Sequence, residues 1–140
     1  MYILDTNVVS ELRRPEKADA NVLNWASRVP VAQFYLSAIT IFELERGIGL
    51  LARRDETQAA SLRQWFEEHI LATFERRIFA IDAAVAMRCA KLHVPDPQSD
   101  RDSFIAATAL VHGMSVVTRN TADFEKTGVP LINPWRSMQR

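Results

Sequence analysis

Acidic side chains stand at three places where a folded chain could bring them together. Asp5 directly follows the apolar run Tyr2–Leu4, and Asp123 closes a polar segment that follows the apolar run ending at Thr118. Asp102 lies in the first turn of an expected helix, where the partial positive charge of the helix end favours a carboxylate. Three carboxylates from distant segments are therefore expected near the ends of strands or helices.

Carboxylates that share one pocket repel one another, and some take up protons unless positive charge compensates them. A hard divalent cation relieves this repulsion, and Mg²⁺ or Mn²⁺ prefers ligands that are all oxygen. Such ions activate water and stabilise the charge that develops at a phosphate. The acids therefore predict a magnesium site for phosphodiester hydrolysis.

Each acid also has a purely structural interpretation. Asp5 could be only a helix cap. Asp102 has the same alternative, and Asp100 competes with it for the cap of that helix. Asp123 could be a turn residue. Residue type and spacing leave these alternatives open.

A fourth acid is marked less clearly. Apolar residues recur at helical spacing over about Thr40–Arg53. Glu43 and Glu45 flank this apolar stripe on its two sides about equally closely. Periodicity alone therefore does not choose between them.

The elements that would position these acids alternate between short apolar runs and longer helical patterns. Strands are expected at Tyr2–Leu4, Phe34–Ser37, Ile78–Ile81, Met114–Thr118 and Pro130–Ile132. Helices are expected from Asp5 through Arg13, at Ala20–Arg28, Thr40–Arg53 and Glu56–Arg76, from Asp82, and from Asp100 or Asp102 to His112. This order predicts an α/β fold with a mainly parallel central sheet flanked by helices on both faces. In such sheets, ligands gather beyond the carboxyl ends of the strands.

The helix that Asp82 would cap has many small residues. Its inward face is expected to hold three alanines and one methionine: Ala83, Ala86, Met87 and Ala90. Cys89 and His93 are four apart on the same helix and could both touch one zinc ion, but no third Cys or His completes such a site. A structural role is the favoured interpretation of both.

Composition sets the class of protein. The 140 residues, 48% of them hydrophobic, suffice for one domain with a proper core. Lysine plus arginine (17) equals aspartate plus glutamate (17), so RNA binding would need a local arginine cluster rather than a globally basic surface.

The single cysteine fits a reducing compartment. With no signal peptide before the first motif and no bilayer-spanning apolar stretch, a cytoplasmic protein without membrane contact is expected.

Several segments, taken in order, resemble one family. They are Ile3–Asn7, Ile41–Leu44 with Gly47-Ile48, Asp102–Ala109, Val117–Asn120 with Asp123-Phe124, and Ile132–Trp135. From about residue 2 to residue 135 the chain resembles the PIN-domain ribonucleases, specifically the VapC/FitB-like toxins of type II toxin–antitoxin pairs. The resemblance implies a single PIN-like domain over residues 1–135, followed by a C-terminal tail, 136–140.

The resemblance also implies roles for individual residues. The family's acidic metal-binding positions fall on Asp5, Glu43, Asp102 and Asp123, which selects Glu43 over Glu45 and Asp102 over Asp100. Its polar supporting positions, which orient carboxylates or a metal-bound water, fall on Thr6, Asn7, Thr118 and Asn120. Three arginines close in sequence to the acids are expected to contact RNA phosphates: Arg46, Arg101 and Arg119.

The function that the resemblance implies is a magnesium-dependent endoribonuclease, with manganese as a possible substitute. The implied partners are an RNA substrate, a second copy of the chain in a homodimer, and a cognate antitoxin whose tail occupies the acidic groove. DNA is expected only through the antitoxin.

Two other functions fit less well. A haloacid-dehalogenase-like phosphatase also places an Asp after its first strand, but needs an acid two positions later, where this chain has Asn7. A PIN-like module that only binds protein or RNA would be expected to lack the acids, and all four are present.

Overall fold

Five short parallel strands form the centre of the computed structural model, which describes residues 1–136. The strands are β1 (Tyr2–Leu4), β2 (Phe34–Ser37), β3 (Ile78–Phe79), β4 (Ser115–Val117) and β5 (Leu131–Ile132). Their order across the sheet is β3-β2-β1-β4-β5, so β1 lies in the middle. Ile3 of β1 lies opposite Tyr35 of β2 and Val116 of β4. Most of the expected tail, residues 137–140, lies outside the described residues.

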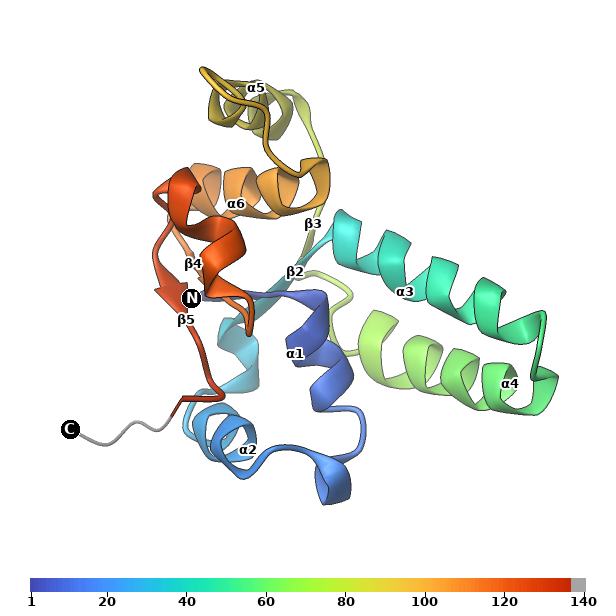
Figure 1. Ribbon diagram of the computed structural model, residues 1–140. Helices are drawn as coiled ribbons and strands as arrows, with labels where there is room; N and C mark the ends of the chain where they lie inside the picture. The colour runs from blue at the N-terminus through green and yellow to red at the C-terminus, as the bar shows by residue number, and fades with distance from the viewer. Residues whose placement is uncertain (137–140) are drawn as a thin grey trace.

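Helices cover both faces of this sheet (Figure 1). They are α1 (Thr6–Glu11), α2 (Ala20–Ser27), α3 (Ala38–Ala52), α4 (Glu56–Trp65), α5 (Ala83–Leu92) and α6 (Asp100–His112). Short helical turns connect them: η1 (Pro15–Lys17), η2 (Val31–Gln33), the π-helical η3 (Phe66–Leu71) and η4 (Thr121–Thr127). The expected α/β fold with a parallel sheet between helices is confirmed.

Alternation of side chains along the strands divides the core into two layers. Ile3 and Val116 pack on one face with Ile105 of α6. Leu4 and Val117 point to the other face, where side chains of α1, α2, α3 and α4 cover them. Because both faces are covered, β1 is apolar along its whole length, and the first charged residue stands at its carboxyl end.

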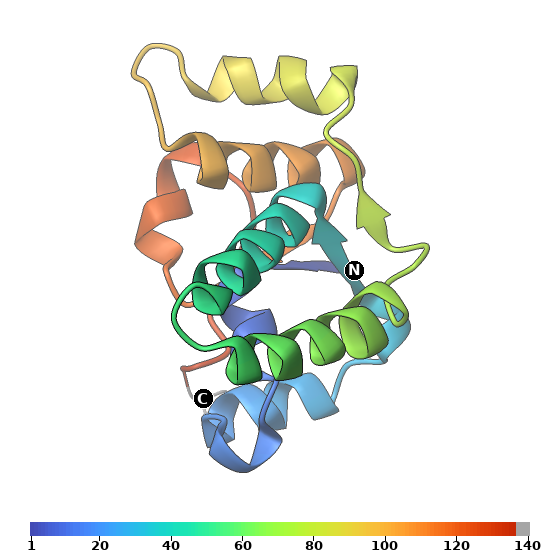
Figure 2. The same ribbon diagram turned by 90° about the vertical axis from the view of Figure 1, so that its right-hand side faces the viewer.

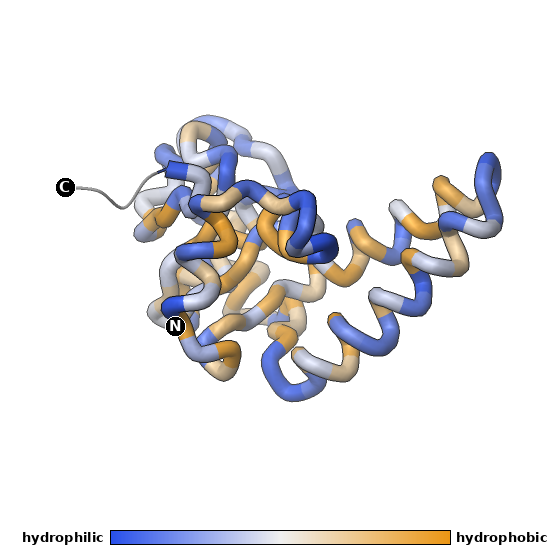
Figure 3. The backbone as a smooth tube through the Cα atoms, turned by 90° about the horizontal axis from the view of Figure 1, so that it is seen from below, coloured by the Kyte–Doolittle hydropathy of each residue, from blue (hydrophilic) through white to orange (hydrophobic). Residues whose placement is uncertain are grey.

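The α3–α4 hairpin extends away from the rest of the molecule (Figures 1 and 2). Seen from below, it carries apolar and polar residues in alternation along both helices (Figure 3). Leu44 and Ile48 of α3 are buried in the core cluster that contains Phe66. On the exposed side, Arg63 of α4 forms an ion pair with Glu45 of α3. The hairpin therefore joins the core through its base and one apolar stripe.

The single helix expected over Glu56–Arg76 is wrong in its second half. The α-helix ends at Trp65, and the chain continues through the π-helical turn η3. Phe66, Ile70 and Phe74, four residues apart, are all buried. In an α-helix, residues four apart drift around the axis by roughly 40° per step, whereas a π-turn has more residues per turn and reduces this drift. The local widening lets all three side chains face the core.

The inward face expected for α5 is also wrong. The structure exposes all four residues of that face: Ala83, Ala86, Met87 and Ala90. Val85 and Cys89 are buried instead, packed against Ala107 of α6. They lie four apart and carry larger apolar side chains than the alanines, so they determine which side of the helix faces the protein.

Helix ends follow the expected capping chemistry. The Asp82 carboxylate accepts a hydrogen bond from the Val85 N–H at 3.0 Å, which caps α5. Gly113 ends α6 in the left-handed region, with φ 68°, where a side chain would be strained.

Within residues 1–136, no helix is both long enough and apolar enough to cross a bilayer.

The core makes one testable prediction about stability. Leu36 of β2 is 0% exposed, whereas Leu50 of α3 is 59% exposed. We expect Leu36→Ala to lower the free energy of unfolding by about 2–5 kcal/mol, because it leaves a cavity in a packed core. Leu50→Ala, the matched control, should lower it by less than about 1 kcal/mol. Urea denaturation of both variants measures the difference, and equal losses would contradict this assignment of the core.

Candidate active site

The carboxylate of Asp5 is the centre of the site. It follows β1 directly, its side chain is 0% exposed, and its backbone N–H bonds Val117 O at 2.9 Å. Oδ1 accepts a hydrogen bond from the Thr6 N–H at 2.7 Å, so Asp5 caps α1 as the structural interpretation requires. Oδ2 accepts the Thr118 hydroxyl at 2.7 Å. The same carboxylate thus caps a helix and faces the other acids.

Glu43, rather than Glu45, joins this centre. Glu43 of α3 accepts a hydrogen bond from the Thr6 hydroxyl, which itself lies 3.2 Å from the hydroxyl of buried Thr40. Glu45 points away and pairs with Arg63 on the exposed side of the hairpin. The choice that periodicity left open is therefore made by which side of α3 faces α1.

Asp102, rather than Asp100, also faces this centre from the first turn of α6. Its side chain is largely buried, whereas that of Asp100 is 86% exposed and lies 3.7 Å from His93. Burial raises the pKa of Asp102; Arg101 opposes this shift, and the negative charges of Asp5 and Asp123 add to it. Asp102 therefore lies close enough to Asp5 and Asp123 for their charges to act on it, although burial is the larger cause of the raised pKa.

Asp123 lies at the rim of the site, in η4. It is exposed and lines a small pocket together with Asp102. Its backbone N–H bonds the carbonyl of Asn120 at 3.0 Å, as the turn interpretation of Asp123 requires. Its side chain can therefore approach Asp102 from solvent without being fixed by burial.

Four polar residues were expected to orient the acids, and three of their side chains do so. Thr6 bonds Glu43, and Thr118 bonds Asp5. The Asn7 amide lies 3.4 Å from Asp5 Oδ2, and its oxygen accepts the backbone N–H of Arg119 at 3.3 Å. Asn120 contributes differently, because its backbone N–H donates to the Thr118 hydroxyl at 3.0 Å.

The guanidinium of Arg101 brings three of the acids together. Nη2 contacts Asp5, Nε contacts Glu43 and Nη1 contacts Asp102, so each of three nitrogens binds a different carboxylate. Burial alone would lower the pKa of Arg101, but the hydrogen bonds and charges of Glu43 and Asp5 outweigh it and raise the pKa above its ordinary value. Arg101 is therefore charged throughout the accessible pH range.

The other two arginines singled out by sequence lie on the surface. Arg46 stacks over the ring of Phe42, with 5.0 Å from its guanidinium carbon to the ring centroid. Arg119 stacks over Trp135 at 5.4 Å. Arg46 lines a pocket together with Glu43, whereas Arg101 is engaged with the acids themselves. Contact of any of the three with RNA phosphates stays a prediction.

The donors at the site suit a hard divalent cation, because Asp5, Glu43 and Asp102 bring carboxylate oxygens to one guanidinium and Asp123 lies beside Asp102. A cationic group already fits among three of them, as Arg101 shows. In residues 1–136 as they stand, no three His, Cys, Asp or Glu side chains are arranged around a common metal position. The guanidinium nitrogens of Arg101 occupy the space between the carboxylates. Binding of an ion at that place therefore requires the Arg101 side chain to move.

Two residues of the site were missed by reading the sequence. Thr40 is buried and its hydroxyl contacts that of Thr6, but a lone Thr within an apolar helix carries no pattern that marks it. Arg101 was expected at RNA, not among the acids. Its position one residue before Asp102, in the first turn of a helix, was the available signal, since a cation there is disfavoured by the helix end.

The fold and the site together define an α/β domain with three acids gathered around one arginine at the carboxyl ends of its central strands. Comparison with known proteins gives the family, since residues 2–130 match the PIN domain. The chain belongs to the PIN-domain family, in the branch of the VapC and FitB proteins.

Relatives in this branch match over nearly their whole length. The VapC ribonuclease Y4jK of Sinorhizobium fredii is 36% identical, covering 96% of this chain and 98% of the relative. The toxin FitB of Neisseria gonorrhoeae is 37% identical, covering 96% of this chain and 99% of the relative. A crystal structure of FitAcB from Neisseria gonorrhoeae superposes with a TM-score of 0.88 at 35% identity, over 97% of this chain and 99% of that one.

The site predicts that the Thr118 hydroxyl stabilises the fold through Asp5. We expect Thr118→Val to lower the free energy of unfolding by about 1.5–3 kcal/mol, because a buried carboxylate loses a donor. Thr108→Val is the matched control: Thr108 is equally buried, but its hydroxyl bonds the neutral carbonyl of Phe104. Its loss should be about 0.5–1.5 kcal/mol. Urea denaturation in chelator tests this, and a larger loss for Thr108→Val would refute it.

Proposed function

We propose that the chain is a magnesium-dependent endoribonuclease that serves as the toxin of a type II toxin–antitoxin pair and hydrolyses RNA phosphodiester bonds with metal-activated water. The observation that carries this proposal is the convergence of Asp5, Glu43 and Asp102, from three separate segments, on the guanidinium of Arg101, with Asp123 beside Asp102. Membership of the branch that contains a VapC ribonuclease supports the choice of RNA as substrate.

The residues of the site take distinct roles in this reaction. Mg²⁺, or Mn²⁺ in its place, held by Asp5, Asp102 and Asp123 would supply positive charge that lowers the pKa of the attacking water and offsets the charge at the phosphate. Glu43, fixed by Thr6, is placed to hold that water or take its proton. The water oxygen bonds to phosphorus in line with the ester oxygen that leaves.

The supporting groups hold the carboxylate of Asp5 in a fixed orientation. Thr118 and the Thr6 N–H donate to the two oxygens of Asp5, which fixes the direction in which its remaining lone pairs point. Because these donors are buried or belong to the backbone, the orientation is set before RNA arrives. Because the carboxylate is already oriented, the reaction does not carry the free-energy cost of ordering it.

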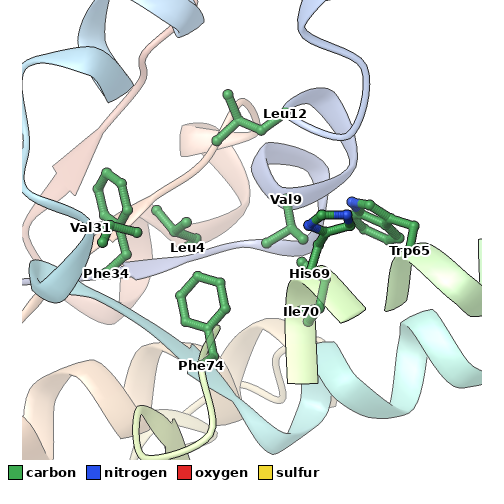
Figure 4. A pocket seen from close by; sticks show the side chains of 9 residues that line it. All are labelled: Leu4, Val9, Leu12, Val31, Phe34, Trp65, His69, Ile70 and Phe74. Atoms are coloured by element: carbon green, nitrogen blue, oxygen red, sulfur yellow. The ribbon is translucent and has the colours of Figure 1, made fainter. Parts of the chain in front are cut away.

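A cognate antitoxin is the second partner in this proposal. An apolar pocket of about 210 Å³ opens between the carboxyl half of α1, η2 and the α4–η3 segment (Figure 4). Leu12, Trp65 and Ile70 line it, and Val31 stands exposed at its edge. We assign an apolar segment of the antitoxin to this pocket, since the relative FitB is named as a toxin. The antitoxin's tail would continue to the acidic groove, and DNA would be reached only through the antitoxin.

A second copy of the chain completes the proposed assembly. Phe42 of α3 and Met87 of α5 are large apolar side chains that are more than half exposed, and we propose that the second copy covers them. The mass of the purified chain in solution measures whether it is a homodimer. We place its action in the cytoplasm, where its RNA substrate is found, with no membrane partner.

The catalytic proposal is tested by incubating defined RNAs with the purified chain in magnesium or in chelator. We expect cleavage in magnesium, none in chelator, and none for Asp5→Asn, because that change removes a charged metal ligand while keeping a side-chain oxygen for the helix cap. Circular dichroism checks that the variant is folded. Magnesium-dependent cleavage by a folded Asp5→Asn variant would overturn the assignment.

The two glutamates of α3 provide a matched control. Glu43→Gln should slow cleavage by about 100-fold or more, as expected for loss of a group that holds or deprotonates water. Glu45→Gln, two positions along the same helix, should leave the rate within about threefold, because Glu45 faces Arg63 and not the acids. Equal effects of the two changes would argue that Glu43 has no role in the chemistry.

The partner proposal makes a separate prediction. Val31→Asp places a charge at the edge of the apolar pocket, and it should weaken binding of the cognate antitoxin at least about tenfold, because the carboxylate would be desolvated without a partner. Val94→Asp, at an exposed site beyond α5, is the matched control and should have no effect. Calorimetric titration measures both. Unchanged affinity in Val31→Asp would remove this pocket as the antitoxin site.

A further inference from the structure

Arg101 uses three different nitrogens to bind three different acids, and this arrangement has an energetic consequence for metal binding. The acids come from the end of β1, from α3 and from α6, so one side chain links three segments of the site. Arg101 is the residue next to Asp102, and its own side chain is 33% exposed. It can therefore leave the acids without unfolding the helix that carries it.

The oxygens that Arg101 contacts are those that a cation would need. Asp5 Oδ2 is held by the buried Thr118 hydroxyl, and Oδ1 is shared between the Thr6 N–H and Arg101. Two of these three partners are fixed by the fold. The guanidinium is the partner that can move, so its contact is the one that an incoming ion would displace.

Helix electrostatics also indicate that the acids hold Arg101 in place. It lies in the first turn of α6, where the partial positive charge of the helix end disfavours a cation. The ion pairs with Asp5, Glu43 and Asp102 offset this cost. A divalent ion would cancel two of these three negative charges, so the acids would then hold the guanidinium less strongly against the helix end.

Space for the displaced side chain exists beside the site. A pocket of about 270 Å³ is lined by Arg101, Glu43, Phe42 and Phe104, with Asp100 and Arg46 also at its wall. The apolar rings can pack against the arginine stem, and the exposed Asp100 offers a carboxylate outside the acidic centre that offsets the charge of Arg46. Rotation of the Arg101 side chain toward Asp100 would take the guanidinium off Asp5 and Asp102 while Glu43 stays alongside.

We propose that Arg101 is a built-in competitor of the catalytic cation: it holds Asp5, Glu43 and Asp102 together in the metal-free chain and must leave them before the ion binds. This inference rests on the proposed function, since it assumes that the acids bind a divalent ion. It gives the chain an internal, reversible block on its own site. The metal concentration at which the enzyme becomes active is then set partly by residue 101.

The competition is tested by titrating Mn²⁺ into the purified chain without RNA, using calorimetry. Arg101→Met keeps the length of the stem but removes the charge. We expect it to bind Mn²⁺ at least about tenfold more tightly, because apparent affinity is reduced by the fraction of molecules in which the site is blocked. Arg101→Lys, which keeps the charge but cannot bridge three acids, should lie between the two.

A second readout separates competition from a merely structural role. In chelator, Arg101→Met should unfold several degrees below the wild type, because three carboxylates lose their shared cation. With saturating Mn²⁺ this deficit should disappear or reverse. A purely structural arginine would lower both the melting temperature and the metal affinity. Opposite signs for the two measurements are therefore the signature of competition.

Two control variants make each outcome decisive. Arg53→Met removes an exposed charge at the far end of α3, and should change Mn²⁺ affinity by less than about twofold. Asp5→Asn should abolish the tight binding. Unchanged or weaker affinity in Arg101→Met, or an equal gain in Arg53→Met, would overturn the competitor while leaving the ribonuclease proposal standing. If the wild type and Arg101→Met both bind no Mn²⁺, the metal-dependent function and the competitor fall together.

Discussion

Negative oxygens can share a poorly solvated pocket only if positive charge and hydrogen-bond donors surround them, and this constraint shapes the whole site. Asp5 is fully buried at the end of the central strand, yet each of its oxygens accepts at least one hydrogen bond. Arg101 supplies positive charge that partly compensates the negative charges of Asp5, Glu43 and Asp102. Burial, with the charges of Asp5 and Asp123, still raises the pKa of Asp102 against the opposing effect of Arg101.

Strand order explains how residues far apart in sequence meet these demands. Because β1 lies between β2 and β4, the segments that follow all three strands emerge at one edge of the sheet. Asp5 follows β1 and Thr118 follows β4, so a hydroxyl 113 positions away in sequence reaches the carboxylate. α3 follows β2 and turns Glu43 toward α1. A parallel sheet with its central strand first in the chain thus assembles the pocket from strand ends and the first turns of helices.

The strands and most helices could be predicted because they depend on local apolar periodicity. Asp5 could be marked by its place at the end of a strand, whereas the family resemblance was needed to select Glu43 and Asp102. Periodicity could not separate Glu43 from Glu45, since both flank the same stripe and only the packing of α3 on α1 distinguishes them. It failed on α5, where alanines dilute the pattern. The role of Arg101 could not be predicted either, because it depends on three long-range contacts that exist only after folding.

The outermost position of α5 has a consequence for local opening of the protein. α5 rests on α6 and not on the sheet, and it buries little beyond Val85 and Cys89 (Figure 2). On α6 it covers Ala107 and the partly buried Phe104, a smaller cluster than either layer on the sheet, so detaching α5 exposes less apolar surface than opening the sheet would. Its backbone amides should therefore exchange with solvent deuterium faster than those of the sheet. The loop that follows leads to the first turn of α6, which carries Asp102, so we expect opening of α5 to loosen this acid while the sheet stays intact.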